Sequence, residues 1–135
     1  MPRFWNGMLA VDTNVIVRLL AGDDATQSPQ ARLVFSQNEV LIMTTVLLET
    51  EWVLRRVYQH DRRALSGMLR ALMGLPNVRL ENAERVAFAL DRLEAGADFA
   101  DALHLSGAGD ADAFATFDRA CVKASTPESV PVQVL

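Results

Sequence analysis

Short, continuously apolar runs alternate with longer amphipathic stretches along this chain, and this alternation constrains the fold more than any other feature. The runs "MLAV" (8–11), "VLIMTT" (40–45) and "AFATF" (113–117) are typical of strands buried on both faces of a parallel sheet. "NVRL" (77–80) and "VPVQVL" (130–135) predict two further short strands. The sequence therefore predicts an α/β fold, with helices sandwiching a mainly parallel central sheet.

The stretches between these runs carry helical spacing and helix-end signals. Ser28 and Pro29 predict an N-cap followed by proline at the first helical position. One helix is expected over 46–59, where the apolar spacing places Trp52 in the core and Glu51 on the surface or in a salt bridge. The other expected helices cover residues 14–20, 30–37, 61–75, 82–96 and 97–109.

Length and composition predict one soluble domain spanning residues 1–135. Half of the residues are apolar, which is enough for a core, and the net charge of −4 predicts no broad basic surface. Cys121 is the only cysteine, so no internal disulfide forms, and we expect a buried structural thiol. The apolar runs are too short for a membrane span, and "FWNGMLAV" is too short for a signal peptide, so a cytoplasmic protein is expected.

Acidic side chains recur where the predicted strands end or the helices begin. Asp12 directly follows the first apolar run, and Asp118 follows a late one. Glu49 lies about one turn into the helix after the second run, while Asp98 and Asp101 share one face at the start of another helix. Because the functional crevice of an open parallel sheet forms outside the carboxyl ends of its strands, we expect these acids to converge there.

Converging carboxylates repel one another, so a cation is expected among them. Mg²⁺ prefers oxygen ligands and phosphate, and it lowers the pKa of a bound water, which suits phosphodiester hydrolysis. Thr13, Asn14 and Thr116 are placed to add polar contacts at the same site. Taken singly, each acid also suits a plain structural role, as a helix cap, a first-turn acid or a solvated side chain.

Four blocks in order resemble the PIN-domain nucleases, and in particular the VapC toxins of bacterial toxin–antitoxin pairs: "LAVDTNVIVRLL", "TTVLLETEWVLR", "ADFADALHLSGA" and "FATFDRA". The resemblance implies a three-layer α/β/α sandwich and a Mg²⁺-dependent endoribonuclease, with Mn²⁺ as a substitute. It assigns the catalytic and metal-binding roles to Asp12, Glu49 (directly or through water), Asp101 and Asp118, with Asp98 in support. It also matches Thr13, Asn14 and Thr116 to the small polar residues around such a site.

The resemblance further implies an RNA substrate, a homodimer, and a VapB-type antitoxin that covers or disrupts the site. An acidic protein that binds a polyanion needs local cations, and bound metal inverts the local field. Arginine forks suit phosphate, and the candidates for RNA contacts are Arg18, Arg55, Arg56, Arg62 and Arg63. The extension "MPRFWNG" before the first strand is longer than is typical of the family.

Three other readings remain open. A PIN-domain nuclease could serve RNA processing without a toxin role, and a catalytically silent PIN fold could serve as a binding module. A phosphorylatable receiver domain has a similar α/β architecture, but it needs a lysine after its fifth strand. Lys123 is the only lysine, and it lies in a predicted helix past Asp118, which disfavours the receiver.

Overall fold

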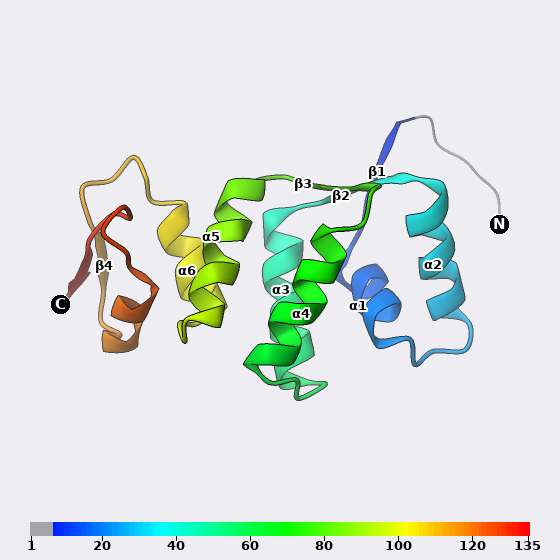
Figure 1. The fold of residues 1–135 in the computed structure, drawn as a ribbon, viewed down its shortest axis with the longest axis horizontal. Helices are drawn as coiled ribbons and strands as arrows, with labels where there is room; N and C mark the ends of the chain where they lie inside the picture. Colours follow the sequence, from blue (N-terminus) through cyan, green and yellow to red (C-terminus); the bar gives the residue numbers. More distant parts are fainter. Residues whose placement is uncertain (1–6) are drawn as a thin grey trace. The chain divides into compact units, whose positions relative to one another are not determined.

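Parallel strand pairing organises both parts of the chain in the computed structural model, which describes residues 7–135 (Figure 1). The chain divides into a first unit, Met1–Asn82, and a second unit, Ala83–Leu135. The predicted N-terminal extension lies outside the described residues except for Gly7. No helix within 7–135 is both long enough and apolar enough to cross a membrane.

The first unit contains a three-stranded parallel sheet in the order β1-β2-β3. Its strands are β1 (Met8–Ala10), β2 (Glu39–Ile42) and β3 (Val78–Leu80). In the register, Leu9 pairs with Val40, and Val40 pairs with Val78. Val40 is fully buried because it lies on the central strand. The predicted strands at 8–11 and 77–80 are confirmed.

The second apolar run was predicted as a strand over 40–45, but β2 ends at Ile42 and a helix begins at Thr44. Met43 provides no side-chain cap for this helix. The carboxylate of Glu81 instead accepts the Thr44 N–H at 2.8 Å, from a position just after β3. The strand is therefore shortened by a cap that is distant in sequence, which no local pattern predicts.

Four helices accompany the first sheet, and they are α1 (Thr13–Ala21), α2 (Gln27–Gln37), α3 (Thr44–Arg56) and α4 (Arg62–Met73). Helix α1 packs against α2 and α3, and α3 packs against α4 (Figure 1). Gly22 ends α1 in the left-handed conformation with φ of 64°, which glycine adopts at little cost. These helices place the start of α1 and the first turns of α3 side by side.

The predicted N-cap at Ser28 is wrong, because α2 begins one residue earlier at Gln27. Ser28 is buried, and its hydroxyl donates to the carbonyl of Arg18 at 2.8 Å. Asp24 supplies the missing acceptor, since its Oδ1 receives the Gln27 N–H at 2.7 Å. Proline at position 29 still lies in the first turn, where its missing N–H is harmless.

The core-facing stripe of α3 also differs from the prediction. The buried residues follow i, i+3 and i+4 spacing and are Val46, Leu47, Thr50, Glu51 and Leu54. Glu51 is only 1% exposed, and its Oε2 accepts from Nε of Arg55 at 3.0 Å, so its salt bridge is confirmed but its surface position is wrong. Trp52 is 50% exposed rather than in the core. The stripe is rotated toward Glu51 because Arg55, one turn on, neutralises that carboxylate.

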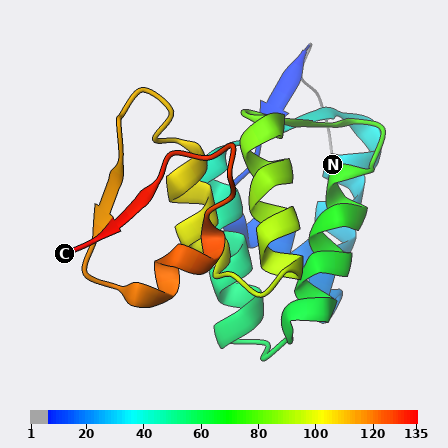
Figure 2. The same ribbon diagram turned by 60° about the vertical axis from the view of Figure 1, so that its left-hand side comes forward.

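The second unit contains a separate pair of parallel strands, which Figure 2 shows side by side. Its elements are α5 (Ala83–Glu94), α6 (Phe99–Ser106), β4 (Phe114–Thr116), the 3₁₀ helix η1 (Arg119–Ala124) and β5 (Val132–Val134). Helices α5 and α6 form the main packing contact of this unit, and Phe99 and Leu90 are fully buried. Cys121 is buried, as predicted. All strand pairs in the described residues are parallel, which confirms the predicted fold class.

Candidate functional site

Asp12 lies at the junction between β1 and α1, where the extended backbone turns into a helix. Its Oδ1 accepts the Thr13 N–H at 2.8 Å, so Asp12 is the N-cap of α1. The positive end of the α1 dipole faces this carboxylate and stabilises its charge. Asp12 is exposed, although the preceding Val11 is buried. A buried strand and a helix start therefore hold one exposed carboxylate in a fixed place.

Thr13 joins this junction to α3. The Thr13 side chain is buried, and its hydroxyl donates to Oε1 of Glu49 at 2.5 Å. Glu49 itself is exposed on α3, so the bond orients a solvent-accessible carboxylate from below. Asp12 and Glu49 are 37 positions apart, yet each bonds to Thr13, one at its N–H and the other at its hydroxyl. The structure thus brings the two predicted acids of the first unit together.

A cavity of about 360 Å³ opens beside these two carboxylates. Its lining residues come from α1 and from α3 and its end, and they are Asp12, Thr13, Asn14, Val17, Arg18, Glu49, Val53, Val57 and Tyr58. A second cavity, of about 370 Å³, lies between α1 and α2 and shares Asn14 and Arg18 with the first. Carboxylates, an amide, a guanidinium and apolar side chains therefore face one ligand-sized space.

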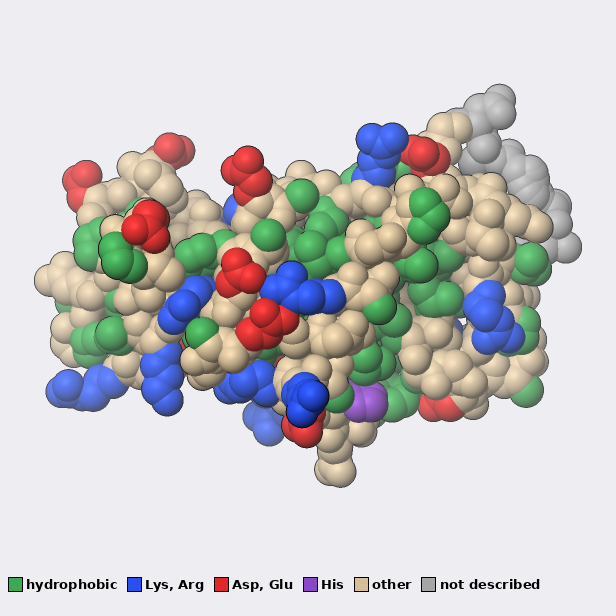
Figure 3. All heavy atoms as spheres, in the orientation of Figure 1, with side chains coloured by type: hydrophobic (Ala, Val, Ile, Leu, Met, Phe, Trp, Pro, Cys, Tyr) green, Lys and Arg blue, Asp and Glu red, His purple; other side chains and the backbone are tan. Residues whose placement is uncertain are grey.

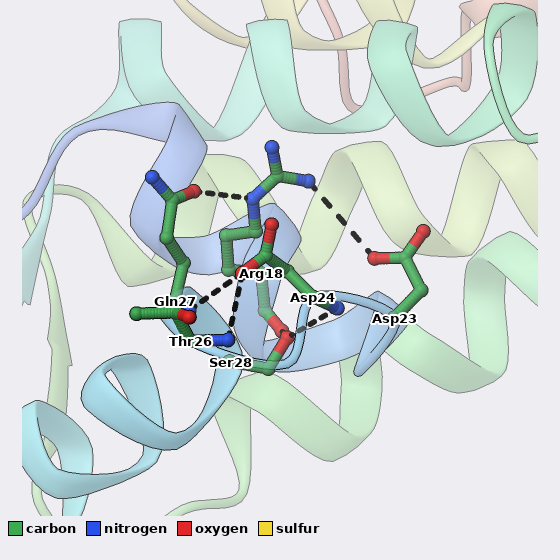
Figure 4. A network of polar contacts seen from close by, with 6 residues as sticks. All are labelled: Arg18, Asp23, Asp24, Thr26, Gln27 and Ser28. Atoms are coloured by element: carbon green, nitrogen blue, oxygen red, sulfur yellow. Dashed lines mark hydrogen bonds and ion pairs between the residues drawn. The ribbon is translucent and has the colours of Figure 1, made fainter.

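Arg18 is held in place by the loop between α1 and α2, as Figure 4 shows. Its Nε donates to Oε1 of Gln27 at 2.7 Å, and its Nη1 lies 3.9 Å from Oδ1 of Asp23. The backbone N–H groups of Gln27 and Thr26, together with the charge of Arg18, hold the pKa of Asp24 below its usual value. Arg18 is the predicted RNA-contacting arginine that lines the cavity beside Asp12 and Glu49.

The other predicted arginines are placed differently. Arg55 is engaged by the buried Glu51, whereas Arg56 is exposed at the end of α3. On the face that Figure 3 draws, each unit carries both Lys or Arg and Asp or Glu side chains. Binding of a polyanion on that face would depend on local cations.

In the second unit, two predicted acids cap helices. Asp98 is the N-cap of α6, and its Oδ2 accepts the Asp101 N–H at 3.0 Å. Asp118 is the N-cap of η1, where its Oδ1 accepts the Ala120 N–H at 2.9 Å. The N–H of Asp118 donates to the hydroxyl of Thr116 at 3.0 Å, which places that predicted polar residue beside the acid. The capping role that the sequence allowed for Asp118 is confirmed, whereas Asp98, expected in the first turn, is instead the N-cap of α6. A cap leaves a carboxylate able to bind a ligand as well.

Like charges crowd this part of the second unit. Partial burial raises the pKa of Asp101, the negative charges of Asp98 and Asp118 raise it further, and His104 opposes them. Burial also raises the pKa of the Cys121 thiol, as do the charges of Asp101, Asp118 and Asp98. The thiol therefore stays protonated near neutral pH, which excludes it as a ready nucleophile. Three carboxylates interact with one another around the start of α6 and the end of β4.

The predicted acids thus form two groups, Asp12 with Glu49 in the first unit and Asp98, Asp101 and Asp118 in the second. Their convergence at one sheet edge stays a prediction.

Tyr58 is a cavity-lining residue that the sequence did not lead us to expect. Glu49, Val53 and Val57 recur every four residues and so share one helix face, which ends beside Tyr58. This spacing is the sequence signal that could have identified Tyr58.

Within residues 7–135, no three Asp, Glu, His or Cys side chains gather closely enough to form a complete metal site. The donors on each unit nevertheless fit a hard divalent cation, because they are carboxylate, hydroxyl and amide oxygens. The raised pKa of Asp101 is a second sign of fit, since a cation would relieve the repulsion from Asp98 and Asp118.

Comparison with known proteins supplies the family. A family model described as the PIN domain matches residues 9–125, from β1 to beyond η1, and so spans both units. A search of curated proteins finds no match. The predicted α/β class with parallel strands agrees with this family. The chain therefore belongs to the PIN domain family, whose members are generally nucleases and typically use divalent metals.

Proposed function

We propose that this protein is a Mg²⁺-dependent endoribonuclease that acts in the cytoplasm as the toxin of a type II toxin–antitoxin pair. A VapB-type antitoxin holds it inactive, and the active form is a homodimer. Mn²⁺ substitutes for Mg²⁺. The observation that carries the nuclease proposal is the pair of carboxylates, Asp12 and Glu49, fixed through Thr13 on the wall of a cavity that also contains Arg18.

The carboxylates assigned to the cation are Asp12, Glu49, Asp101 and Asp118, with Asp98 in support. A bound divalent cation would offset charge on the phosphate and lower the pKa of water. Burial and the charges of Asp98 and Asp118 raise the pKa of Asp101, so a cation that stabilises its charged form would offset them. The carboxylates of the two units are proposed to serve a single reaction.

The side chains around the cavity have separate parts in this proposal. Glu49, oriented by the Thr13 hydroxyl, accepts a hydrogen bond from the attacking water and aligns it. Arg18 is held by Gln27 and Asp23 and presents its remaining donors to a phosphate oxygen. Asn14, exposed at the start of α1, offers an amide to the same phosphodiester. Arg56 extends the phosphate contacts, whereas the bond of Arg55 to Glu51 makes Arg55 a weaker candidate.

The nuclease proposal is tested with purified protein, a labelled single-stranded RNA and a matched single-stranded DNA. We expect cleavage of the RNA in Mg²⁺ or Mn²⁺, none after chelation, and recovery when Mg²⁺ is restored. An Arg32→Ala variant is the control and should cut RNA like the wild type, because Arg32 is an exposed arginine of α2 that lines neither cavity. RNA that stays intact in both metals would overturn the proposal, as would cleavage that persists after chelation.

The toxin role is tested in cells. Induction of the chain alone is expected to stop growth, and co-expression of a short neighbouring gene for a DNA-binding antitoxin is expected to restore it. Normal growth on induction, with active nuclease in the lysate, would favour an RNA-processing enzyme.

The homodimer is tested by light scattering of the purified protein. A protein that has the mass of a monomer and still cuts RNA would contradict the dimer.

A further inference from the structure

The cavity beside Asp12 and Glu49 has an apolar wall that the acids do not explain. Val17, Val53 and Val57 line it together with the ring of Tyr58. Phosphate and divalent cations gain nothing from apolar side chains, whereas a nucleobase has flat apolar faces. The cavity volume of about 360 Å³ lies in the range of small-ligand sites.

Tyr58 is built into this wall rather than attached to it by a flexible loop. Just past α3 the backbone turns back through Gln59, whose φ of 58° is the only positive φ of a non-glycine residue among residues 7–135. The N–H of His60 then donates to the carbonyl of Leu54 at 3.1 Å, and the N–H of Tyr58 donates to Val53 at 3.3 Å. These bonds fix where the Tyr58 side chain leaves the backbone.

His60 supports the ring from one side. The Tyr58 and His60 rings are parallel to within 3°, with their centroids 6.4 Å apart, which is an offset stack. Both side chains are half-buried, so the stack is still open to a ligand. An aromatic ring held on one side and lining a cavity on another is the arrangement that binds an unstacked base.

We propose that Tyr58 is a positioning residue that stacks on a nucleobase of single-stranded RNA, next to the phosphodiester that faces Asp12 and Glu49. This inference rests on the proposed nuclease function and adds to it a residue that positions a base of the substrate. A base is free to stack on a side chain only when it is not already stacked in a duplex. Single-stranded RNA is therefore the preferred substrate, and duplex RNA is a poor one.

The test compares Tyr58→Ala and Tyr58→Phe with Trp52→Ala. Trp52 is the matched control, since it is an exposed aromatic residue of α3 outside the lining of the cavity. Removal of a stacking ring weakens binding by about 5- to 150-fold. We expect Tyr58→Ala to raise KM by such a factor with a smaller change in kcat, while Tyr58→Phe and Trp52→Ala stay near the wild type. Thermal melting of each variant checks that the fold is retained.

A second arm measures binding without cleavage. Fluorescence anisotropy in a chelating buffer gives the Kd of a short labelled single-stranded RNA. The same measurement is made for a set of RNAs of this sequence, each of which lacks the base at a different position. When the abasic position is the one that would stack on Tyr58, that RNA should bind wild type and Tyr58→Ala equally, because the base–ring stack is missing from both complexes. An unchanged KM and Kd in Tyr58→Ala would overturn the stacking role, as would an equal loss in Tyr58→Phe.

The two proposals fail in different ways. A wild type that leaves RNA intact in Mg²⁺ removes the nuclease function, and the anisotropy arm still decides whether Tyr58 binds a base. A wild type that cuts RNA while Tyr58→Ala keeps its KM and Kd removes only the stacking role. Duplex RNA cut as fast as single-stranded RNA also overturns the inference.

Discussion

Acids in both units accept hydrogen bonds, but in the second unit the negative charges of three acids also crowd one another. Asp12 and Glu49 are bonded to the N–H and the hydroxyl of Thr13. In the second unit, partial burial raises the pKa of Asp101, and repulsion from Asp98 and Asp118 raises it further. The comparison indicates that Thr13 holds the two acids of the first unit in place, while the second unit holds negative charge that a cation would stabilise.

The largest effect is expected from Asp12→Asn. Asparagine keeps the volume and the ability to cap α1, so the fold should be retained. It removes the charge, and because even the partners of metal ligands typically matter by 10–100-fold, loss of a ligand should lower the cleavage rate by more than about 100-fold. Initial rates and a melting curve check the two halves of this prediction. A variant that cuts like the wild type would remove Asp12 from the site.

Glu49 and Glu51 offer a contrast within a single helix. Glu49→Gln should abolish most of the cleavage with little change in stability, because Glu49 is exposed and only its bond to Thr13 is altered. Glu51→Gln should keep the activity of the folded protein but lower the free energy of unfolding by about 1–3 kcal/mol, since it weakens a buried bond to Arg55. Denaturant titration and cleavage rates measure both. Interchanged results would show that the two roles are assigned the wrong way round.

Thr13→Val tests whether the first unit is pre-organised. The substitution removes the hydroxyl that orients Glu49 and leaves the backbone N–H that bonds to Asp12. We expect kcat to fall about tenfold, with Thr13→Ser close to the wild type because it restores the donor. If valine and serine gave equal rates, the hydroxyl would have no part in positioning Glu49.

A smaller effect, on stability, is expected from Asp101→Asn. Because the pKa of Asp101 is raised in the folded state, its charged form disfavours folding at neutral pH. The amide removes this penalty, so without divalent cation Tm should rise by less than about 5 °C. The gain should shrink as the pH falls through the raised pKa of Asp101 and vanish below the usual value of 3.8, where Asp101 is neutral in both the folded and the unfolded wild type. Melting curves across pH check this, and a variant less stable than the wild type at pH 7 would contradict it.

Sequence patterns predicted the features that depend on neighbouring residues. Asp12 follows a buried run and precedes a helix, so its place at the β1–α1 junction is local information. The end of β2 was missed because its cap, Glu81, is distant in sequence. The face of α3 was misjudged because Trp52 is more apolar than Glu51, yet the packing of α3 buries Glu51 with Arg55 as its partner.

The candidate site also contains some features that the sequence predicts and others that depend on packing. The acids were found from strand ends and helix starts, which are visible in the sequence. The bond from Thr13 to Glu49 and the stack of Tyr58 on His60 depend on how α1 meets α3 and on the turn at Gln59. Neither has a short-range signature, since each depends on backbone geometry that packing decides.

The proposal that carboxylates of both units serve one metal-dependent reaction is tested by the initial rate of RNA cleavage in Mg²⁺ for Asp101→Asn, measured beside Asp12→Asn. Each variant changes one unit and preserves side-chain volume. Both variants are expected to lose more than about 100-fold in rate while both stay folded. Wild-type cleavage by either variant would contradict it.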